Sequence, residues 1–499
     1  MTAKPAELKP KQKPIVLIHG YSAEGKHRAF EEIYQPLLKE LRDTFGGPKV
    51  VEIDLSKWIS LSDGIALDDV SFALDRALKS PKHSHLLDSG FNVIIHSTGA
   101  LVVRNWIRLF GAKPCRIENL IHLAGASFGS GLAHIGRGKL ARWIRQIFQG
   151  LESGIHVLDE LEFGASKTLD LHLHFFKDGQ RMCEDYGVRE VCLIGSRTTD
   201  LMRKIPIRYV REDSSDGVVR TSSGNLNFDY VIVTPTDEAY AIGVKDLDKI
   251  QERRLDNKSL PKNWYQFNLS QFRGKGCHIP FALQYEITHS GPDWGIVGGS
   301  KNRQQILDRI KEALTLDSDA AYRALVSKWN QVTASTLKKA EGLTSKKGGW
   351  NKQKQYEGHS QLIFRIRDQF GYDVEHHDIT FKSSDAKPAG RPKLENMIED
   401  VHVNRINPGT ATYYLRTVKY NAKTKEWANQ LRTVAPLQFE ISGFEPDSVN
   451  IRYLPLSLRL TSTQLQTLIQ PYRTTVFDVA LLRLPTDKVF ALKKDAPLN

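Results

Sequence analysis

The sequence predicts an α/β protein in which helices cover a parallel sheet and an all-β domain follows. From Pro14 onward, short apolar runs rich in β-branched residues alternate with segments of helical periodicity, which is the pattern of a parallel sheet. After residue 360 the strands follow one another with short turns. The chain has 499 residues, of which 40% are hydrophobic, enough for about two or three domains with buried cores.

The first strands of the expected parallel sheet are residues 15–18, 50–53, 91–95 and 120–123, and later strands are 191–194 and 230–233. Apolar residues recur at helical spacing over 70–78 and 101–109, which predicts covering helices. Two more helices are expected at 300–314 and 320–338. In the last part of the chain, strands are expected at 362–367, 379–382, 413–418, 437–441, 449–453 and 476–484.

These elements predict four regions. Residues 1–13 form a flexible N-terminus, and 14–338 form the α/β domain, interrupted by a helical cap over 128–189. A polar linker covers 339–359, with Lys346-Lys-Gly-Gly349 inside it. Residues 360–499 are expected to form a small β-sandwich.

The composition narrows the class of protein. No apolar run approaches the roughly 18 residues of a membrane span, and no signal peptide is visible at the N-terminus. The expected location is therefore the cytoplasm, with secretion by a leaderless route as the alternative. Cys115, Cys183, Cys192 and Cys277 include no C-x-x-C pair, so we expect mostly buried, reduced thiols.

The net charge of +13 lies mainly in residues 331–499. It favours contact with an anionic membrane surface, although solubility alone also explains it.

The strongest local signal for chemistry is Phe91-Asn-Val-Ile-Ile-His-Ser-Thr-Gly-Ala-Leu-Val-Val-Arg104. A strand runs into Ser97, Gly99 follows, and a helix begins, as in a nucleophile elbow. The sharp turn raises the serine hydroxyl above the sheet, and the helix N-terminus favours negative charge beside it. Ile95 occupies the first glycine position of G-x-S-x-G, so we expect it to press on the helix.

A serine nucleophile needs two amides that stabilise the oxyanion. Thr98 follows the serine, and Tyr21 follows His19-Gly20 at the end of the first strand. We expect the backbone N–H groups of Thr98 and Tyr21 to form this oxyanion hole. His19 and His96 are interpreted as buried packing residues, not as bases.

The serine also needs a histidine base and a carboxylate that orients it. In hydrolases with a nucleophile elbow the acid follows the serine and the histidine comes last. Asp216 lies in Asp213-Ser-Ser-Asp-Gly-Val-Val219, where the glycine allows a turn. His289 lies in a later loop rich in glycine and proline. Asp213 and His278 are the alternatives for the acid and the base.

The cap contains a basic amphipathic helix. Arg137, Lys139, Arg142 and Arg145 lie away from its apolar face, which is formed by Leu140, Trp143, Ile144, Ile147, Phe148 and Leu151. Such a helix is suited to a lid that covers the serine in water and meets lipid when open. A static cap that packs on the sheet is the alternative.

The sequence indicates no cofactor, no metal and no nucleic acid partner. Neither a G-x-x-x-x-G-K-[ST] loop nor G-x-G-x-x-G after a strand is present. His172-Leu-His174 alternates as metal-binding strands sometimes do, but the nearby carboxylates are not suitably spaced. His376-His377 lies in an ordinary strand pattern.

Over about residues 14–300 the chain resembles the bacterial lipases and related esterases of the α/β-hydrolase superfamily. The matching pieces are Ile18-His-Gly-Tyr21, His96-Ser-Thr-Gly99, His122-Leu-Ala-Gly-Ala-Ser-Phe-Gly-Ser130 and Asp216-Gly-Val-Val219. The resemblance implies an α/β-hydrolase fold with a helical cap insertion, the triad acid at Asp216, and a lid after Phe128. No family is recognised for residues 360–499.

Together these features predict a serine carboxylester hydrolase that acts on lipids, either a lipase or a phospholipase, with Ser97, His289 and Asp216 as its triad. An acyltransferase that uses the same triad is one alternative. A non-catalytic binding protein, in which Ile95 spoils the elbow, is the other. A protein partner is not predicted.

Overall fold

The computed structural model describes residues 13–19, 28–59, 64–135, 155–198, 212–242, 247, 264–269, 278–343, 352–383, 390–486 and 489. The chain divides into two compact units. The first, the α/β unit, comprises Met1–Leu161, Asp170–Gly224 and Gly276–Gly342. The second, the β unit, comprises Glu162–Leu169, Asn225–Lys275 and Leu343–Asn499.

The α/β unit is built on a six-stranded parallel sheet with the order β2-β1-β3-β4-β5-β8. Its strands are β1 (Ile15–His19), β2 (Val50–Asp54), β3 (Phe91–His96), β4 (Ile117–Leu123), β5 (Arg189–Gly195) and β8 (Phe281–Gln284). The inner strands are continuous apolar runs because helices bury both of their faces. Five of the six were predicted, and β8 was not.

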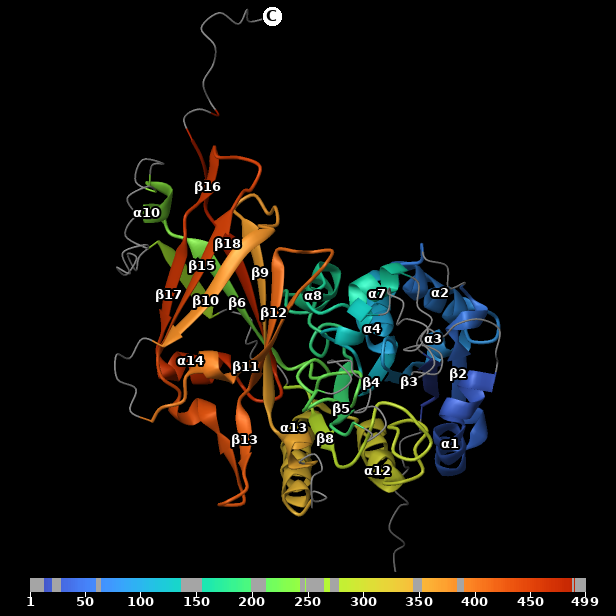
Figure 1. Cartoon of the computed structure of the whole chain (residues 1–499). Helices are drawn as coiled ribbons and strands as arrows, with labels where there is room; N and C mark the ends of the chain where they lie inside the picture. Colours follow the sequence, from blue (N-terminus) through green and yellow to red (C-terminus); the bar gives the residue numbers. More distant parts are fainter. Residues whose placement is uncertain are drawn as a thin grey trace, which may run out of the picture. The chain divides into compact units, whose positions relative to one another are not determined.

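Helices cover this sheet on both sides (Figure 1). The helices are α1 (Arg28–Phe45), α2 (Leu67–Lys79), α3 (His85–Ser89), α4 (Gly99–Phe110), α12 (Arg303–Leu314) and α13 (Asp319–Glu341). Side chains of α1, α12 and α13 share one core cluster with β1, β4 and β5. Helices α2 and α4 are joined by the amide of Asn105, which donates to the hydroxyl of Ser71 over 2.9 Å.

The predicted cap is helical where the structure describes it, with α5 (Gly131–Ile135), α7 (Ile155–Leu161) and α8 (Ser166–His174). His172 and His174 therefore lie on a helix, not on a strand. In the described part of the chain, no helix has the length and apolar character needed to cross a bilayer.

The β unit contains two larger sheets. One is mixed, with the order β11-β12-β9-β18-β6-β7. Its strands are β6 (Phe228–Pro235), β7 (Tyr265–Leu269), β9 (His359–Asp368), β11 (Ile398–Val403), β12 (Thr410–Arg416) and β18 (Thr474–Leu481). The other is antiparallel, with β10 (His376–Ser383), β15 (Leu437–Phe444), β16 (Ile451–Tyr453), β17 (Leu456–Leu460) and β19 (Arg483–Pro485).

Both sheets contribute to one hydrophobic core, in which Phe364 of β9 stacks on Phe477 of β18 and contacts Phe439 of β15. A sandwich requires such a shared core. Smaller elements complete the unit, namely the hairpin of β13 (Val418–Asn421) and β14 (Glu426–Asn429), α10 (Asp237–Tyr240) and α14 (Ser462–Leu468).

One predicted strand lies in a different sheet from the one expected. The prediction that residues 230–233 extend the parallel sheet of the α/β unit is wrong, because β6 pairs in parallel with β18 of the β unit. The local pattern of β6 gives no indication of this partner, which lies about 245 residues later in the chain.

Candidate active site

Ser97 lies at a sharp turn between β3 and α4. Its φ of 55° is in the left-handed region, which is uncommon for a residue with a Cβ and persists only where the surroundings hold it. Here the Ser97 N–H donates to the carbonyl of Leu123, and the Ser97 carbonyl accepts from the N–H of Ala126, both over 3.2 Å. The segment after β4 therefore fixes the strained turn from both sides.

The turn forms although Ile95 stands where a glycine was expected. Ile95 is buried in β3 and pairs with Ile18 and His122 of the neighbouring strands. The close approach occurs instead at Gly125, where an added Cβ would lie 2.9 Å from the Cβ of Ala100 in α4. Gly125 is thus a structural requirement of the elbow that the sequence did not reveal.

His289 follows β8 and lies beside Ser97. Its Nε2 is 3.1 Å from the Ser97 hydroxyl, and its Nδ1 is 2.9 Å from Oδ2 of Asp216. With Nδ1–H donated to the carboxylate, the neutral ring keeps a lone pair on Nε2 that can accept the serine proton. The three predicted side chains therefore form one hydrogen-bonded chain, Ser97–His289–Asp216, although 192 residues separate Ser97 from His289.

Asp216 is fully buried and held at both carboxylate oxygens. Oδ2 accepts from His289, while Oδ1 accepts from the N–H groups of Val218 and Val219 over 3.0 and 2.8 Å. Gly217 provides the turn with a φ of 96°. The carboxylate therefore has one orientation, which is directed at the imidazole.

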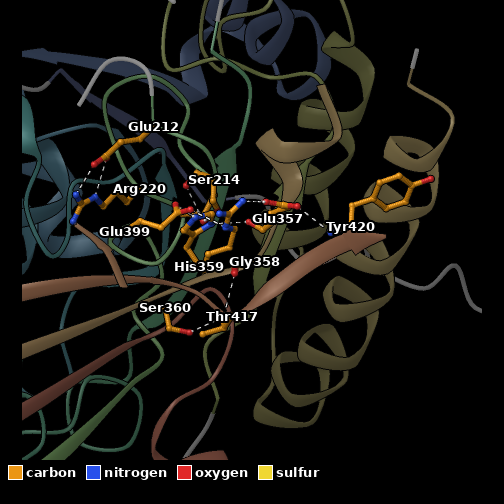
Figure 2. A network of polar contacts seen from close by, with 12 residues as sticks. Glu212, Ser214, Arg220, Glu357, Gly358, His359, Ser360, Glu399, Thr417 and Tyr420 are labelled. Atoms are coloured by element: carbon orange, nitrogen blue, oxygen red, sulfur yellow. Dashed lines mark hydrogen bonds and ion pairs between the residues drawn. The ribbon is translucent and has the colours of Figure 1, made fainter. Parts of the chain in front are cut away.

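A buried ion pair flanks Asp216 in the sequence, between Glu212 and Arg220 (Figure 2). Arg220 donates from Nε and Nη2 to the two carboxylate oxygens of Glu212, over 2.9 and 2.5 Å, and its side chain is 1% exposed. Ser214 and Thr221 share a 2.5 Å hydroxyl contact beneath the same turn. A two-point guanidinium–carboxylate contact fixes orientation as well as distance, so this pair braces the acid. No local sequence pattern indicated this pair.

His96 supports the histidine rather than the serine. Its Nε2 donates to the main-chain carbonyl of His289 over 3.1 Å, and the two rings lie 4.6 Å apart. The His289 N–H donates to the carbonyl of Asp216 over 3.1 Å. Both main-chain groups of His289 are therefore bound. His96 is buried, as its interpretation as a packing residue requires, but its hydrogen bond to His289 was not foreseen.

A buried charged cluster joins α4 to the sheet. Arg104 of α4 contacts both carboxylate oxygens of Glu190 in β5, and His122 of β4 contacts one of them. Burial alone would raise the pKa of Glu190, but the charge of Arg104 and the hydrogen bond from His122 lower it to about 2. Burial lowers the pKa of nearby His172 to about 3, and the Nε2 of His172 donates to the carbonyl of Ser127 over 2.5 Å.

The other predicted site residues have different outcomes. Thr98 directly follows Ser97 and is buried. Tyr21 lies outside the described residues, as do the lid residues Leu140, Trp143, Ile144, Ile147 and Phe148. The alternative base, His278, is exposed, and neither it nor the alternative acid, Asp213, takes part in the chain from Ser97.

Comparison with known proteins bears on the fold. No protein-family model and no curated protein matches the chain. The solved structure of phospholipase PlaB from Legionella pneumophila is similar, with a TM-score of 0.75 and 22% identity over 98% of this chain and 97% of that one. The structure of PlaB in complex with thio-NAD gives a TM-score of 0.74 and 21% identity over the same shares. The predicted resemblance to bacterial lipases is thus confirmed at the level of the fold, which is that of a bacterial phospholipase over nearly the whole chain.

Proposed function

We propose that this chain is a serine carboxylester hydrolase of the α/β-hydrolase fold that acts on lipid acyl esters. The observation that carries the proposal is the hydrogen-bonded chain from the Ser97 hydroxyl through His289 to the buried carboxylate of Asp216. A nucleophile, a base and an orienting acid in this order are the parts that acyl transfer needs.

The reaction follows from the positions of these groups. Nε2 of His289 takes the proton of Ser97 as Oγ attacks the ester carbonyl, and Asp216 stabilises the imidazolium. The N–H of Thr98, with that of Tyr21, stabilises the oxyanion. His289 then protonates the leaving alcohol, an acyl-enzyme remains on Ser97, and water activated by His289 releases the acid.

Two observations support a lipid as the substrate. The fold is shared with phospholipase PlaB over nearly the whole chain, and residues 137–151 have the basic amphipathic pattern of an interfacial lid. Among lipid esters we favour phospholipids, because PlaB, which shares this fold, is a phospholipase.

The test measures fatty acid release from phospholipid dispersions by the wild type and by Ser97→Ala. We expect release by the wild type to rise above the critical micelle concentration, and Ser97→Ala to lower kcat by at least about a thousandfold. Turnover of freely soluble short esters alone would remove the lipid assignment. Equal rates for the wild type and Ser97→Ala would remove Ser97 as the nucleophile.

A further inference from the structure

One end of the β unit exposes large apolar side chains. We name this group the apolar tip; it consists of Phe370, Tyr372, Phe444, Val449 and Val489, which are 68%, 70%, 54%, 84% and 49% exposed. Phe444 is the last residue of β15, and the other four lie on the connections that follow β9, β15 and β19. Large exposed apolar groups gathered at one place mark an interaction site more often than an ordinary surface.

Pairing between the strands brings these connections together. Phe444 is opposite His376 in the β15–β10 pair, and their rings lie 5.2 Å apart. The amide of Gln369, beside Phe370, donates to the carbonyl of Arg483 over 3.0 Å. The N–H of Thr486 donates to the carbonyl of Asn450, beside Val449, over 2.8 Å. The tip is therefore one surface at the end of the unit where Figure 1 labels β16.

The charge of this surface is opposite to that of the chain as a whole. The chain carries +13, but residues 367–376, 444–452 and 481–486 hold five carboxylates and three arginines. Within these ranges, the exposed carboxylates are those of Glu375 and Asp447, and none of the three arginines is exposed. Arg367 and Arg483 each lie 3.9 Å from a carboxylate, of Asp373 and Asp368 respectively. Over these described ranges the tip thus presents aromatic rings and carboxylates, and no exposed lysine or arginine.

We propose that the apolar tip docks on the surface of choline-bearing, zwitterionic phospholipid. The outer layer of such a surface consists of quaternary ammonium groups, which bind to aromatic faces and are attracted by carboxylates. Phe and Tyr side chains also suit the boundary between headgroups and acyl chains. An anionic surface would be repelled by Glu375 and Asp447. This binding does not depend on the ester hydrolysis proposed above.

The test is flotation with vesicles in the Ser97→Ala background, which prevents hydrolysis during the assay. We expect binding to phosphatidylcholine vesicles to exceed binding to phosphatidylglycerol vesicles. Phe370→Ser combined with Tyr372→Ser should weaken binding to phosphatidylcholine by roughly tenfold or more. The matched control is Phe72→Ser in the α/β unit, which removes a 55% exposed aromatic ring and should leave binding unchanged.

A charge-reversed variant tests the selectivity. Glu375→Lys with Asp447→Lys should shift binding toward phosphatidylglycerol. If the unfolding temperature shows that the Phe370→Ser, Tyr372→Ser double variant does not fold, Val449→Asp provides the same test at the most exposed residue of the tip.

Three results would overturn the proposal. The first is unchanged vesicle binding by the Phe370→Ser, Tyr372→Ser double variant. The second is stronger binding to phosphatidylglycerol vesicles than to phosphatidylcholine vesicles by the protein with an unaltered tip. The third is that the protein forms a dimer, which the Phe370→Ser and Tyr372→Ser substitutions convert to a monomer while vesicle binding persists. The tip would then be a contact between protein copies. Absence of ester turnover by the wild type would contradict the proposed hydrolase without affecting these outcomes.

Discussion

At the residue scale, three side chains far apart in the sequence meet because each lies in a turn at the edge of one sheet. Ser97, Asp216 and His289 were identifiable because strand-turn-helix, Asp-Gly and glycine-rich loop patterns are local. The hydrogen bond from His96 to His289 was not identifiable, since no local pattern connects His96 to a residue 193 positions away. Local patterns mark which groups can carry chemistry, but not which main-chain groups hold them.

His96 gives a prediction at this scale. His96→Phe keeps a ring between Tyr34 and His289 but leaves the carbonyl of His289 without this donor. Because this hydrogen bond is lost, we expect the His289 loop to shift by about 1 Å. The shift should lower kcat roughly 10- to 100-fold with little change in KM. His96→Gln places an amide N–H within the same reach and should restore kcat to within about threefold.

Steady-state kinetics on a soluble ester measure this effect in all three proteins. His359→Phe is the matched control, because it removes another buried histidine that contacts a main-chain oxygen, that of Glu357 in the β unit. If His96 acts only by packing, kcat of His96→Phe should be higher than kcat of His96→Gln, and this result would contradict the prediction.

At the element scale, five of the six strands of the parallel sheet were predicted from their apolar pattern, and the short strand β8 was not. Strand β8 has four residues, too few to distinguish from an apolar loop. Strand β6 was found, but its sheet was wrongly assigned, because a local pattern does not specify a partner as distant as β18. The packing of α4 against the segment after β4 was likewise hidden, since it depends on the missing side chain of Gly125.

Gly125 supports a prediction about this packing. In Gly125→Ala the added methyl would lie 2.9 Å from the Cβ of Ala100, so α4 or the Ala124–Ala126 segment must move. We expect a loss of about 1–3 kcal/mol in the free energy of unfolding and a lower kcat, because the carbonyl of Ser97 accepts from Ala126.

Urea unfolding, followed together with activity, measures both effects. Gly64→Ala is the control, since nothing lies within 4 Å of its added Cβ. A Gly125→Ala protein as stable and active as the Gly64→Ala protein would contradict the close packing.

At the scale of the whole molecule, the chain passes from one unit to the other more than once. Residues Glu162–Leu169 and Asn225–Lys275 belong to the β unit although segments of the α/β unit surround them in the sequence. The β unit therefore cannot be read as one C-terminal stretch, and only strand pairing reveals its composition.

The buried charged cluster predicts how stability depends on pH. Because the pKa of His172 is about 3 in the folded chain and its ordinary value is 6.5, the unfolded chain binds more protons between these values. The free energy of unfolding should therefore fall as the pH falls through this window, by roughly 2–3 kcal/mol between pH 7 and 4.5. Glu190 adds a loss between pH 4.5 and about 2, as its lowered pKa requires.

His172→Gln keeps an N–H donor for the Ser127 carbonyl but cannot be protonated, so its stability should change less over pH 4.5–7. Thermal unfolding across this range measures the difference, and exposed His278→Gln is the control. Parallel curves for the wild type and His172→Gln would contradict a neutral, buried His172.

The claim on which the account depends is that the Ser97 hydroxyl is activated by His289 and Asp216, and covalent labelling with a fluorophosphonate tests it most directly. Peptide mass analysis should locate the label on Ser97, and Ser97→Ala should not react. Asp216→Asn should slow labelling by at least about a hundredfold, whereas Asp213→Asn in the same turn should label at the wild-type rate. An unlabelled wild type, or a label on another serine, would contradict the account.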